Sequence, residues 1–401
     1  MKRIVLLLTL LAVLSSCQKQ YRFKGESSKA VLTKSQSEVL TGIGNVSFDI
    51  GGRIFQEKGS FVFSPASMAV VSGLLSAAAD EQSQVELCEK LGFEDGRQES
   101  FNEFCVSLLS LLRSDTNVNL RFSNALFYNS SINLSDTYYR LAKEFYDADC
   151  FSANSIQQSV NTWLRNVSED ENYSPVGDLP EDTQIAMMSY MGINAELKTP
   201  FPKQGIFESV FQSNEGKARD ILMMHSLQTL PYLEDDSFTF IRVPYAGNDY
   251  YASFILPAKD KSIKDVFDII SKIGWASIES RASNVLVYMD LPVFSVESET
   301  DFIPVLKGIG MNHVFSSRAD FSKISADNIK YELKDIRQNS TISFSEKGTE
   351  GTSLSRAALT LVEDPLTESE QDYSYFIANR PFLFVIGQKS TGALLYIGAY
   401  C

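Results

Sequence analysis

The order of the periodic segments limits the fold of this chain more than any other feature of its sequence. Apolar residues recur at helical spacing in segments 64–79, 101–113 and 136–148 of the first half. Alternating apolar residues around short turns predict two β-hairpins in the second half, at 238–256 and 382–399. Helices lead and strands follow, without the regular strand–helix rhythm of a parallel sheet, and this order is typical of the α+β class.

No linker-like stretch or internal repeat divides the chain after about residue 41. Its 401 residues are enough for one large domain or for about two to three smaller ones. Apolar residues make up 44% of the chain and charged residues 21%, which are the values of a globular protein rather than of a disordered one.

The N-terminus has the features of an export signal. Lys2 and Arg3 precede the apolar run Ile4–Leu14, which is shorter than the about 20 residues that span a bilayer. The run ends in Ser15-Ser16-Cys17, which resembles a bacterial lipoprotein signal; a plain signal peptide with an incidental Cys is the alternative. We predict a signal peptide over 1–16, lipidation of Cys17 and a polar spacer over 17–41.

Charge and motif content exclude several functions. The net charge of −14 argues against a general nucleic-acid binder, because such a protein must neutralise phosphates. His225 and His313 are the two histidines, so a His-rich metal site is excluded, and we interpret both as structural. The sequence has no nucleophile elbow, zinc-protease helix or phosphate-binding loop. We therefore predict no catalytic residue, metal or cofactor, although counting acids does not exclude two-carboxylate chemistry.

Four cysteines follow Cys17, and none forms a Cys-x-x-Cys pair. Disulfides are chemically allowed in an exported protein, but two of the four lie in apolar helical patterns where a small buried thiol is expected. We predict no essential disulfide among these four: Cys88, Cys105, Cys150 and Cys401.

Two segments near the C-terminus resemble a known family. Phe376–Ile386, with the sequence FIANRPFLFVI, resembles the C-terminal signature of the serpins, and Glu346–Glu350 upstream resembles the serpin hinge. Shorter matches run in the family's order through the rest of the chain: Phe63–Ser67, Leu197–Phe201, Val243–Tyr245, Ile255–Pro257, Leu291–Phe294, Leu306–Met311 and Ala319–Ser322. By this resemblance the chain is identified as a serpin.

The resemblance implies a fold and a mechanism. It implies one large domain over 42–401 with about three β-sheets, a helical N-terminal half and an exposed reactive-centre loop at about 348–375. Serpins offer this loop to a serine or, in some cases, a cysteine endopeptidase. The cleaved loop then enters the central sheet and traps the acyl-enzyme as a covalent 1:1 complex. The protein would be a monomeric inhibitor rather than an enzyme, held at the cell envelope, periplasmic or surface-exposed, through its lipid alone.

The loop sequence suits insertion into a sheet. Side chains alternate between the two faces of a strand, and the two charges, Glu350 and Arg356, fall on the same face. No proline occurs between Gly348 and Glu363, so no backbone donor is missing. An accidental alternation in a polar loop is the alternative. The other face carries small side chains and one leucine: Thr349, Gly351, Ser353, Ser355, Ala357 and Leu359.

The length of the inserting strand selects the bond that is cleaved. In inhibitory serpins about fourteen residues, or about 46 Å of strand, separate the hinge glycine from the residue before the cut. That length leads to Val362, followed by Glu363, with Leu361 as a neighbouring candidate. A cut after Arg356 would leave about 26 Å, which is too short to displace a protease. The apolar residues favour an elastase-like target, and the acids of 363–372 either steer a basic protease or form a solvated tether.

Several positions depart from the family pattern. Gln338 stands at the usual buried His of the strand before the hinge, and Ser189 stands at its usual Asn partner. Leu197 replaces the usual Trp, and Val293 replaces the Lys that pairs with Glu346. Ser64 and Ser67 match the family at the sheet-opening region, whereas Gly351 stands where Ala is usual. Either the sheet opens more readily, or insertion is slow, and a non-inhibitory binding lipoprotein on this fold is the alternative function.

Overall fold

The computed structural model describes residues 33–93, 96–112, 118–168, 177–214, 216–350 and 373–401. Six of the nine α-helices in these described ranges precede residue 170, which confirms the predicted helical first half. In the part of the chain so described, no helix combines the length and the apolar character needed to cross a membrane. The helices are α1 (Lys34–Lys58), α2 (Pro65–Ala78), α3 (Glu81–Lys90), α4 (Gln98–Leu112), α5 (Asp136–Tyr146), α6 (Ile156–Ser168), α7 (Ile263–Ile273), α8 (Trp275–Arg281) and α9 (Phe302–Gly308).

Capping side chains fix where the first helices begin. The hydroxyl of Thr33 accepts a hydrogen bond from the Gln36 amide, and the Gln36 side chain bonds back to the Thr33 amide, so α1 starts with a capping box. The hydroxyl of Ser64 caps α2, and Pro65 occupies its first turn, as the sequence predicts. Helix α1 thus begins inside the segment expected to be a spacer.

The larger sheet has nine strands and contains both predicted hairpins. The hairpin at 238–256 forms β7 and β8, and the hairpin at 382–399 forms β14 and β15. The sheet has the order β1-β15-β14-β8-β7-β6-β9-β13, with β5 added beside β6. Its strands are β1 (Phe61–Phe63), β5 (Ile206–Gln212), β6 (Ala218–Glu234), β7 (Phe238–Pro244), β8 (Tyr250–Pro257), β9 (Ser283–Pro292), β13 (Ser374–Ile377), β14 (Phe382–Gln388) and β15 (Leu394–Tyr400).

The smaller sheet has six strands in the order β10-β11-β12-β4-β2-β3. Hydrogen bonding thus defines two sheets among the described residues rather than about three. The reason is the length of β6, whose first part pairs with β5 and β9 and whose end pairs with β7, so that two strand groups become one sheet. The strands are β2 (Asn119–Asn129), β3 (Ala148–Ala153), β4 (Ile185–Glu196), β10 (Phe294–Asp301), β11 (Arg337–Phe344) and β12 (Gly348–Glu350).

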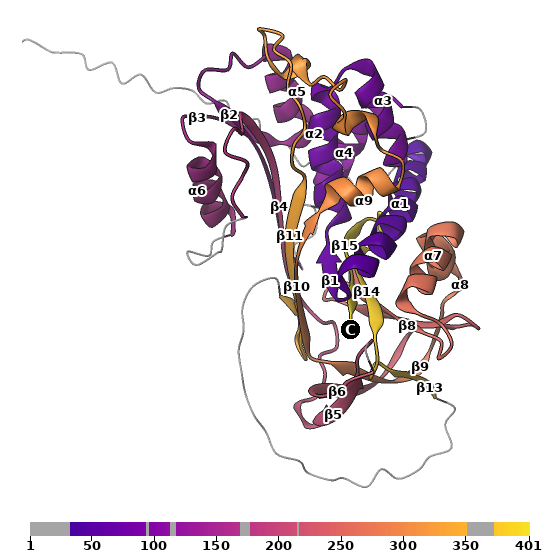
Figure 1. Ribbon diagram of the computed structural model, residues 1–401. Helices are drawn as coiled ribbons and strands as arrows, with labels where there is room; N and C mark the ends of the chain where they lie inside the picture. The colour runs from indigo at the N-terminus through magenta and orange to yellow at the C-terminus, as the bar shows by residue number, and fades with distance from the viewer. Residues whose placement is uncertain (1–32, 94–95, 113–117, 169–176, 215, 351–372) are drawn as a thin grey trace, which may run out of the picture.

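Helices cover both faces of the six-stranded sheet (Figure 1). Helix α6 packs on one face through Trp163 and Leu164, which lie in a small cluster with Phe127 of β2. Helix α2 lies on the other face, in the main core, and its Gly73 leaves room for the ring of Tyr146 from α5. A Cβ at Gly73 would lie 2.4 Å from that ring, so close packing at this point requires glycine.

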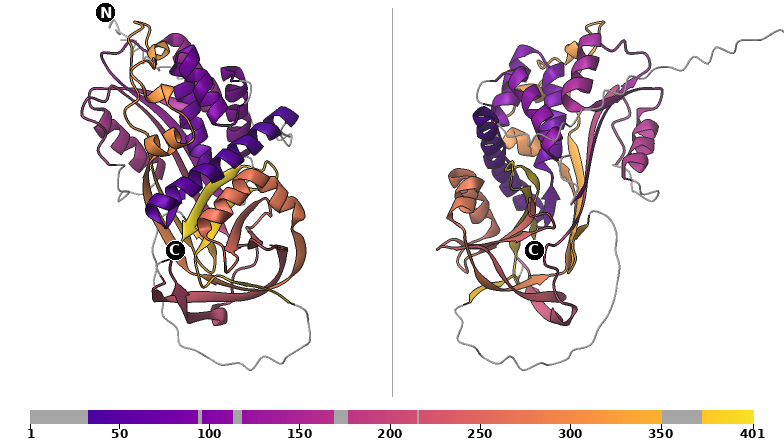
Figure 2. Two further views of the ribbon diagram at one scale, coloured as in Figure 1. Left: turned by 45° about the vertical axis from the view of Figure 1, so that its right-hand side comes forward. Right: turned by 180° about the vertical axis from the view of Figure 1, so that it is seen from behind.

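The described chain begins at the end of the molecule that carries α3 and α4. The side-chain amide of Gln36 donates to the Ser107 hydroxyl of α4 at 2.6 Å, and the backbone of Gly42 lies against Gly92 after α3. Strands β5, β6 and β13 lie at the opposite end (Figures 1 and 2).

Candidate functional site

The hinge segment forms a short strand inside the six-stranded sheet. Strand β12 lies between β11 and β4 and is antiparallel to both, with Glu350 opposite Ser343 on one side and Asn194 on the other. Among the described residues, β12 alone joins β11 to β4. The sheet therefore has a place for a central strand, and three residues of the hinge already occupy its beginning.

Backbone hydrogen bonds fix the turn that leads into β12. The amide of Phe201 donates to the Glu346 carbonyl at 2.9 Å, and the amide of Leu197 donates to the Lys347 carbonyl at 2.6 Å. Gly348 has φ +152°, and a Cβ there would lie 2.0 Å from the Ala195 carbonyl oxygen. The approach of β12 to β4 therefore requires glycine at this position.

The side chain of Thr349 points into the protein. It is completely buried, and its hydroxyl is hydrogen-bonded to the hydroxyl of Tyr245, which is also completely buried. Burial raises the pKa of Tyr245 far above its usual range, so its hydroxyl stays protonated. The sequence patterns do not identify Tyr245 as a site residue, and its place in the family-like segment Val243–Tyr245 is the one signal for it.

The substituted positions near the hinge are filled by apolar packing. Leu197, which directly follows β4, is buried and makes an isolated antiparallel β-bridge with Tyr245. Val293 is half-buried, and its amide donates to the Leu222 carbonyl at 2.9 Å. Glu346 is half-buried, and no ion pair to it forms within the described residues. The charge pair expected for the family is therefore not rebuilt from another cation in this part of the chain.

Gln338 connects β11 to the start of α2. Its side-chain oxygen accepts a hydrogen bond from the Ser64 amide at 2.6 Å, and its side-chain nitrogen donates to the Ser64 carbonyl at 3.2 Å. The Ser64 hydroxyl in turn accepts from the Ser67 amide at 3.2 Å. Three of the four predicted sheet-opening residues thus form one chain of hydrogen bonds.

Ser189 of β4 is the fourth residue, and it is not part of that chain. Its hydroxyl oxygen is buried and has no hydrogen-bond partner among the described residues. Opposite it on β2 lies Asn124, whose side-chain nitrogen donates to the Tyr146 carbonyl at 2.8 Å and whose side-chain oxygen is also unpartnered. A buried hydroxyl without a partner is costly, so Ser189 requires an explanation.

The remaining predicted site residues lie outside the described residues. Of Glu350 the structure describes the backbone, in β12. The others are Cys17, Gly351, Leu361, Val362 and Glu363.

No disulfide forms among the cysteines of the described residues, which are Cys88, Cys105, Cys150 and Cys401. The side chain of His225 is hydrogen-bonded to Asp290 across β6 and β9 at 2.8 Å, and its ring packs on Tyr288. Both ring nitrogens of His313 are buried without a partner among the described residues.

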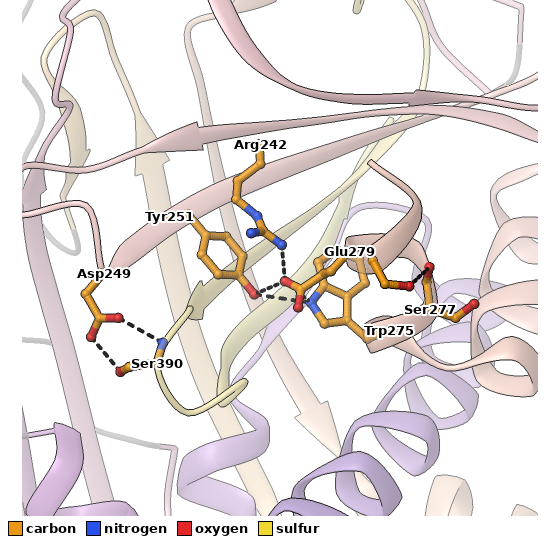
Figure 3. Close-up of polar contacts among 8 residues, drawn as sticks. Arg242, Asp249, Tyr251, Trp275, Ser277, Glu279 and Ser390 are labelled. Carbon is orange, nitrogen blue, oxygen red and sulfur yellow. Dashed lines mark hydrogen bonds and ion pairs between the residues drawn. The ribbon is translucent and has the colours of Figure 1, made fainter. Parts of the chain in front are cut away.

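A polar cluster joins α8 to β7 and β8 of the larger sheet (Figure 3). Glu279 of α8 pairs with Arg242 of β7 and accepts hydrogen bonds from Tyr251 at 2.7 Å and Trp275 at 2.9 Å. The guanidinium of Arg242 also lies over the Tyr251 ring at 4.3 Å. These contacts hold α8 against β7 and β8.

A protein with this fold, and with a hinge strand entering the centre of a sheet, is a serpin. Residues 41–401 match the family described as serpin (serine protease inhibitor), and the chain belongs to this family. Residues 1–18 match the prokaryotic membrane lipoprotein lipid attachment site, so the chain is a membrane-anchored lipoprotein. The predicted family and the predicted lipoprotein signal are confirmed. Serpins are typically protease inhibitors that bind their target proteases, and not enzymes.

Similar proteins extend over nearly the whole chain. Intracellular coagulation inhibitor 2 of Tachypleus tridentatus is 24% identical over 405 residues, which covers 98% of this chain and 97% of that protein. The native crystal structure of tengpin, a thermophilic serpin, has a TM-score of 0.79 at 21% identity, with 92% and 95% coverage. Human thyroxine-binding globulin has a TM-score of 0.76 at 22% identity, with 91% and 98% coverage. The two structures show the fold.

Proposed function

We propose that this lipoprotein is a suicide inhibitor of endopeptidases, which traps its target by inserting the cleaved reactive-centre loop between β4 and β11. The observation that carries the proposal is the position of β12, which starts the inserted strand in a defined register. An antiparallel strand between two parallel ones can form backbone hydrogen bonds along both edges. Completion of this strand is the source of the free energy that drives trapping.

The register of β12 specifies where later loop residues go. The pairing is antiparallel. For each step forward along the loop, the opposing residue on β11 and on β4 therefore moves back by one position. In the inserted strand that we propose, Ser353 would lie between Ser340 and Met191, and Ser355 between Gln338 and Ser189. Because Thr349 points inward, Ser353 and Ser355 would also point inward by alternation. The inward face of the inserting strand is therefore the uncharged one.

This register supplies a reason for the unpartnered hydroxyl of Ser189. After insertion the hydroxyl of Ser355 would lie beside Ser189 and Gln338. This position is between the sheet and the start of α2, which the Gln338–Ser64 hydrogen bonds already join. A hydroxyl both donates and accepts, so Ser355 can satisfy Ser189 without displacing the Gln338–Ser64 bonds. The native state would then hold one unsatisfied group that the inserted state satisfies.

The chemical step belongs to the protease. Its serine hydroxyl attacks the carbonyl carbon of Val362, the bond to the nitrogen of Glu363 breaks, and the new amino terminus leaves with the proton from that serine. The serine ester remains on Val362 while the loop inserts. The small apolar residues before the bond favour an elastase-like protease, and an apolar-pocket cysteine protease would form the corresponding thioester.

The test combines the soluble chain 18–401 with pancreatic elastase, with trypsin as the control for a cut after Arg356. We expect a covalent band on a denaturing gel and a released C-terminal fragment that begins at Glu363, identified by mass spectrometry. A fragment that begins at Ala357 together with a trapped trypsin would overturn the assignment of the bond. Clean cleavage by every protease tried, with no gain in thermal stability of the product, would overturn the inhibitor proposal itself.

The second candidate is a non-inhibitory binding lipoprotein on the same fold. The observation that favours it is the altered entry to the sheet, where Leu197 and Val293 replace the expected Trp and Lys and Glu346 lacks its ion pair in the described chain. Human thyroxine-binding globulin shares the fold. A loop that is cleaved without insertion would leave the melting temperature of the product unchanged, and that result separates the two candidates.

We also propose that the protein acts as a monomer at the bacterial envelope, either in the periplasm or on the cell surface. The lipid on Cys17 is its contact with the membrane, and its net charge of −14 gives no electrostatic attraction to anionic lipid. The chain 18–401, exported behind a signal peptide that is cleaved without lipidation, should appear in the soluble fraction. Retention of this protein in the membrane fraction would contradict anchoring through Cys17.

A further inference from the structure

Apolar and aromatic side chains gather on the exposed face of β6, β9 and β13. Leu227, Tyr288 and Tyr375 form one row across these strands, and His225, Asp290 and Ile377 form the next. Side chains directly opposite each other share a face of a sheet, and so do residues two apart along a strand. These six residues are called the outer aromatic face below. Leu227 is 44% exposed, Tyr375 58% and Ile377 37%.

The outer aromatic face is ordered by its own contacts. The ring of His225 packs on Tyr288 with a centroid distance of 4.1 Å, and Tyr288 lies 5.5 Å from Tyr375. The hydrogen bond from His225 to Asp290, at 2.8 Å, fixes the orientation of the imidazole. Rigid aromatic side chains lose little conformational freedom on binding, which is the property of residues that dominate interface energies.

The position of the face in the chain points to its occupant. Tyr375 lies in the strand that follows the reactive-centre loop directly, and Tyr373 is eleven residues after Val362. Eleven extended residues span at most about 40 Å. A protease of about 230 residues has a radius of gyration of about 17 Å. These lengths allow the surface of a protease that holds Val362 to contact the outer aromatic face.

We propose that the outer aromatic face is a second docking surface for the target endopeptidase, binding an apolar patch beside its active-site cleft. This inference rests on the proposed inhibitory function. The face acts before cleavage, because it orients the protease on the loop and thereby raises the rate of encounter. It takes no part in loop insertion, since none of its residues belongs to the six-stranded sheet.

The test uses matched threonine substitutions, which preserve β propensity. Leu227→Thr and Tyr375→Thr alter the face, singly and together. Leu222→Thr is the control, because Leu222 is 43% exposed on the same strand and alternation places it on the opposite side of the sheet. Second-order rate constants of inhibition and the stoichiometry of inhibition are measured with whichever of elastase, chymotrypsin and subtilisin the wild type traps.

We expect the double variant to inhibit at least about tenfold more slowly, as for the loss of interface anchors, with the stoichiometry and melting temperature unchanged. Leu222→Thr should stay within twofold of wild type, and Tyr375→Phe should retain the wild-type rate. Equal rates for all variants would overturn this inference and leave the inhibitor proposal standing. A wild type that traps none of the three would overturn both. A wild-type dimer that becomes monomeric in the double variant would assign the face to a second copy of the chain instead.

Discussion

The hydroxyl of Thr349 is hydrogen-bonded to the hydroxyl of Tyr245, and both side chains are completely shielded from solvent. The residue that starts the inserting strand is thus already fixed in the core before cleavage. A charged side chain at this position has no partner in the core and must stay in water.

Thr349→Arg should therefore convert the protein from an inhibitor into a substrate. The arginine keeps the hinge outside the sheet, so cleavage continues while trapping is lost. Denaturing gels with elastase measure the ratio of covalent complex to cleaved product. Lys347→Arg is the matched control, because Lys347 is exposed two residues away and should trap normally. Undiminished trapping by Thr349→Arg would show that the hinge inserts in another register.

Gln338→Ala should destabilise the native protein by about 1–3 kcal/mol, because the Ser64 amide loses its partner and the Ser64 carbonyl keeps only the bond from the Met68 amide. The free energy of unfolding in guanidinium chloride measures this loss. Asn339→Ala is the control on the neighbouring residue, whose side-chain oxygen has no hydrogen-bond partner among the described residues. Equal effects of the two substitutions would mean that the link between β11 and α2 contributes nothing to stability.

Ser189→Ala should have an effect that depends on cleavage. In the native state it removes a hydroxyl without a partner in the described structure, so the free energy of unfolding should change by less than about 0.5 kcal/mol. In the cleaved form it removes the proposed partner of Ser355 and should cost about 1 kcal/mol. A double-mutant cycle with Ser355→Ala, measured on both forms, isolates this coupling. Coupling in the native form alone would contradict the proposed register.

Asp290→Asn should change how stability depends on pH. Burial raises the pKa of Asp290 above its ordinary value of 3.8, and the contact with His225 offsets part of this rise. The folded state therefore binds a proton more tightly than the unfolded state. Stability is lost as the pH increases from 3.8 through the raised pKa, and the asparagine variant should lack this loss.

Urea unfolding at successive pH values measures the effect at Asp290. Asp265→Asn is a control of opposite sign, because hydrogen bonds from Ser262 lower the pKa of Asp265. Its carboxylate contributes stability above the unfolded-state value of 3.8, and this contribution is lost as the pH falls through the lowered pKa. The same pH dependence in both variants would contradict the assignment at Asp290.

Local patterns in the sequence predict much of this fold. The cap at Ser64, the hairpins at 238–256 and 382–399 and the helical first half follow from spacing and turn residues, and the structure confirms them. The number of strands in each sheet does not follow from these patterns. It depends on whether a long strand such as β6 stays continuous and pairs with two groups of strands. That choice is made by packing between residues distant in the sequence.

The candidate site can be predicted from the sequence only in part, because its contacts also join residues that are distant in the sequence. The hinge glycine and Gln338 were identified by position, but the partners that explain them are distant. The Ala195 carbonyl that excludes a Cβ at Gly348, and the Ser64 backbone that Gln338 binds, come from other elements of the fold. The role of Tyr245 likewise depends on a contact 104 residues away, which no local period encodes.

The start of α1 beside α3 and α4 has a consequence for an anchored inhibitor. Sixteen residues separate Cys17 from Lys34, and a chain of that length spans at most about 58 Å, so the lipid tethers the end of the molecule that bears α3 and α4. Strands β5, β6 and β13 lie at the opposite end of the molecule (Figures 1 and 2). Since the loop strand runs antiparallel to β4, insertion would carry a captured protease inward to the lipid surface. The covalent complex of inhibitor and inactivated protease would stay anchored to the cell membrane and would not diffuse into the medium.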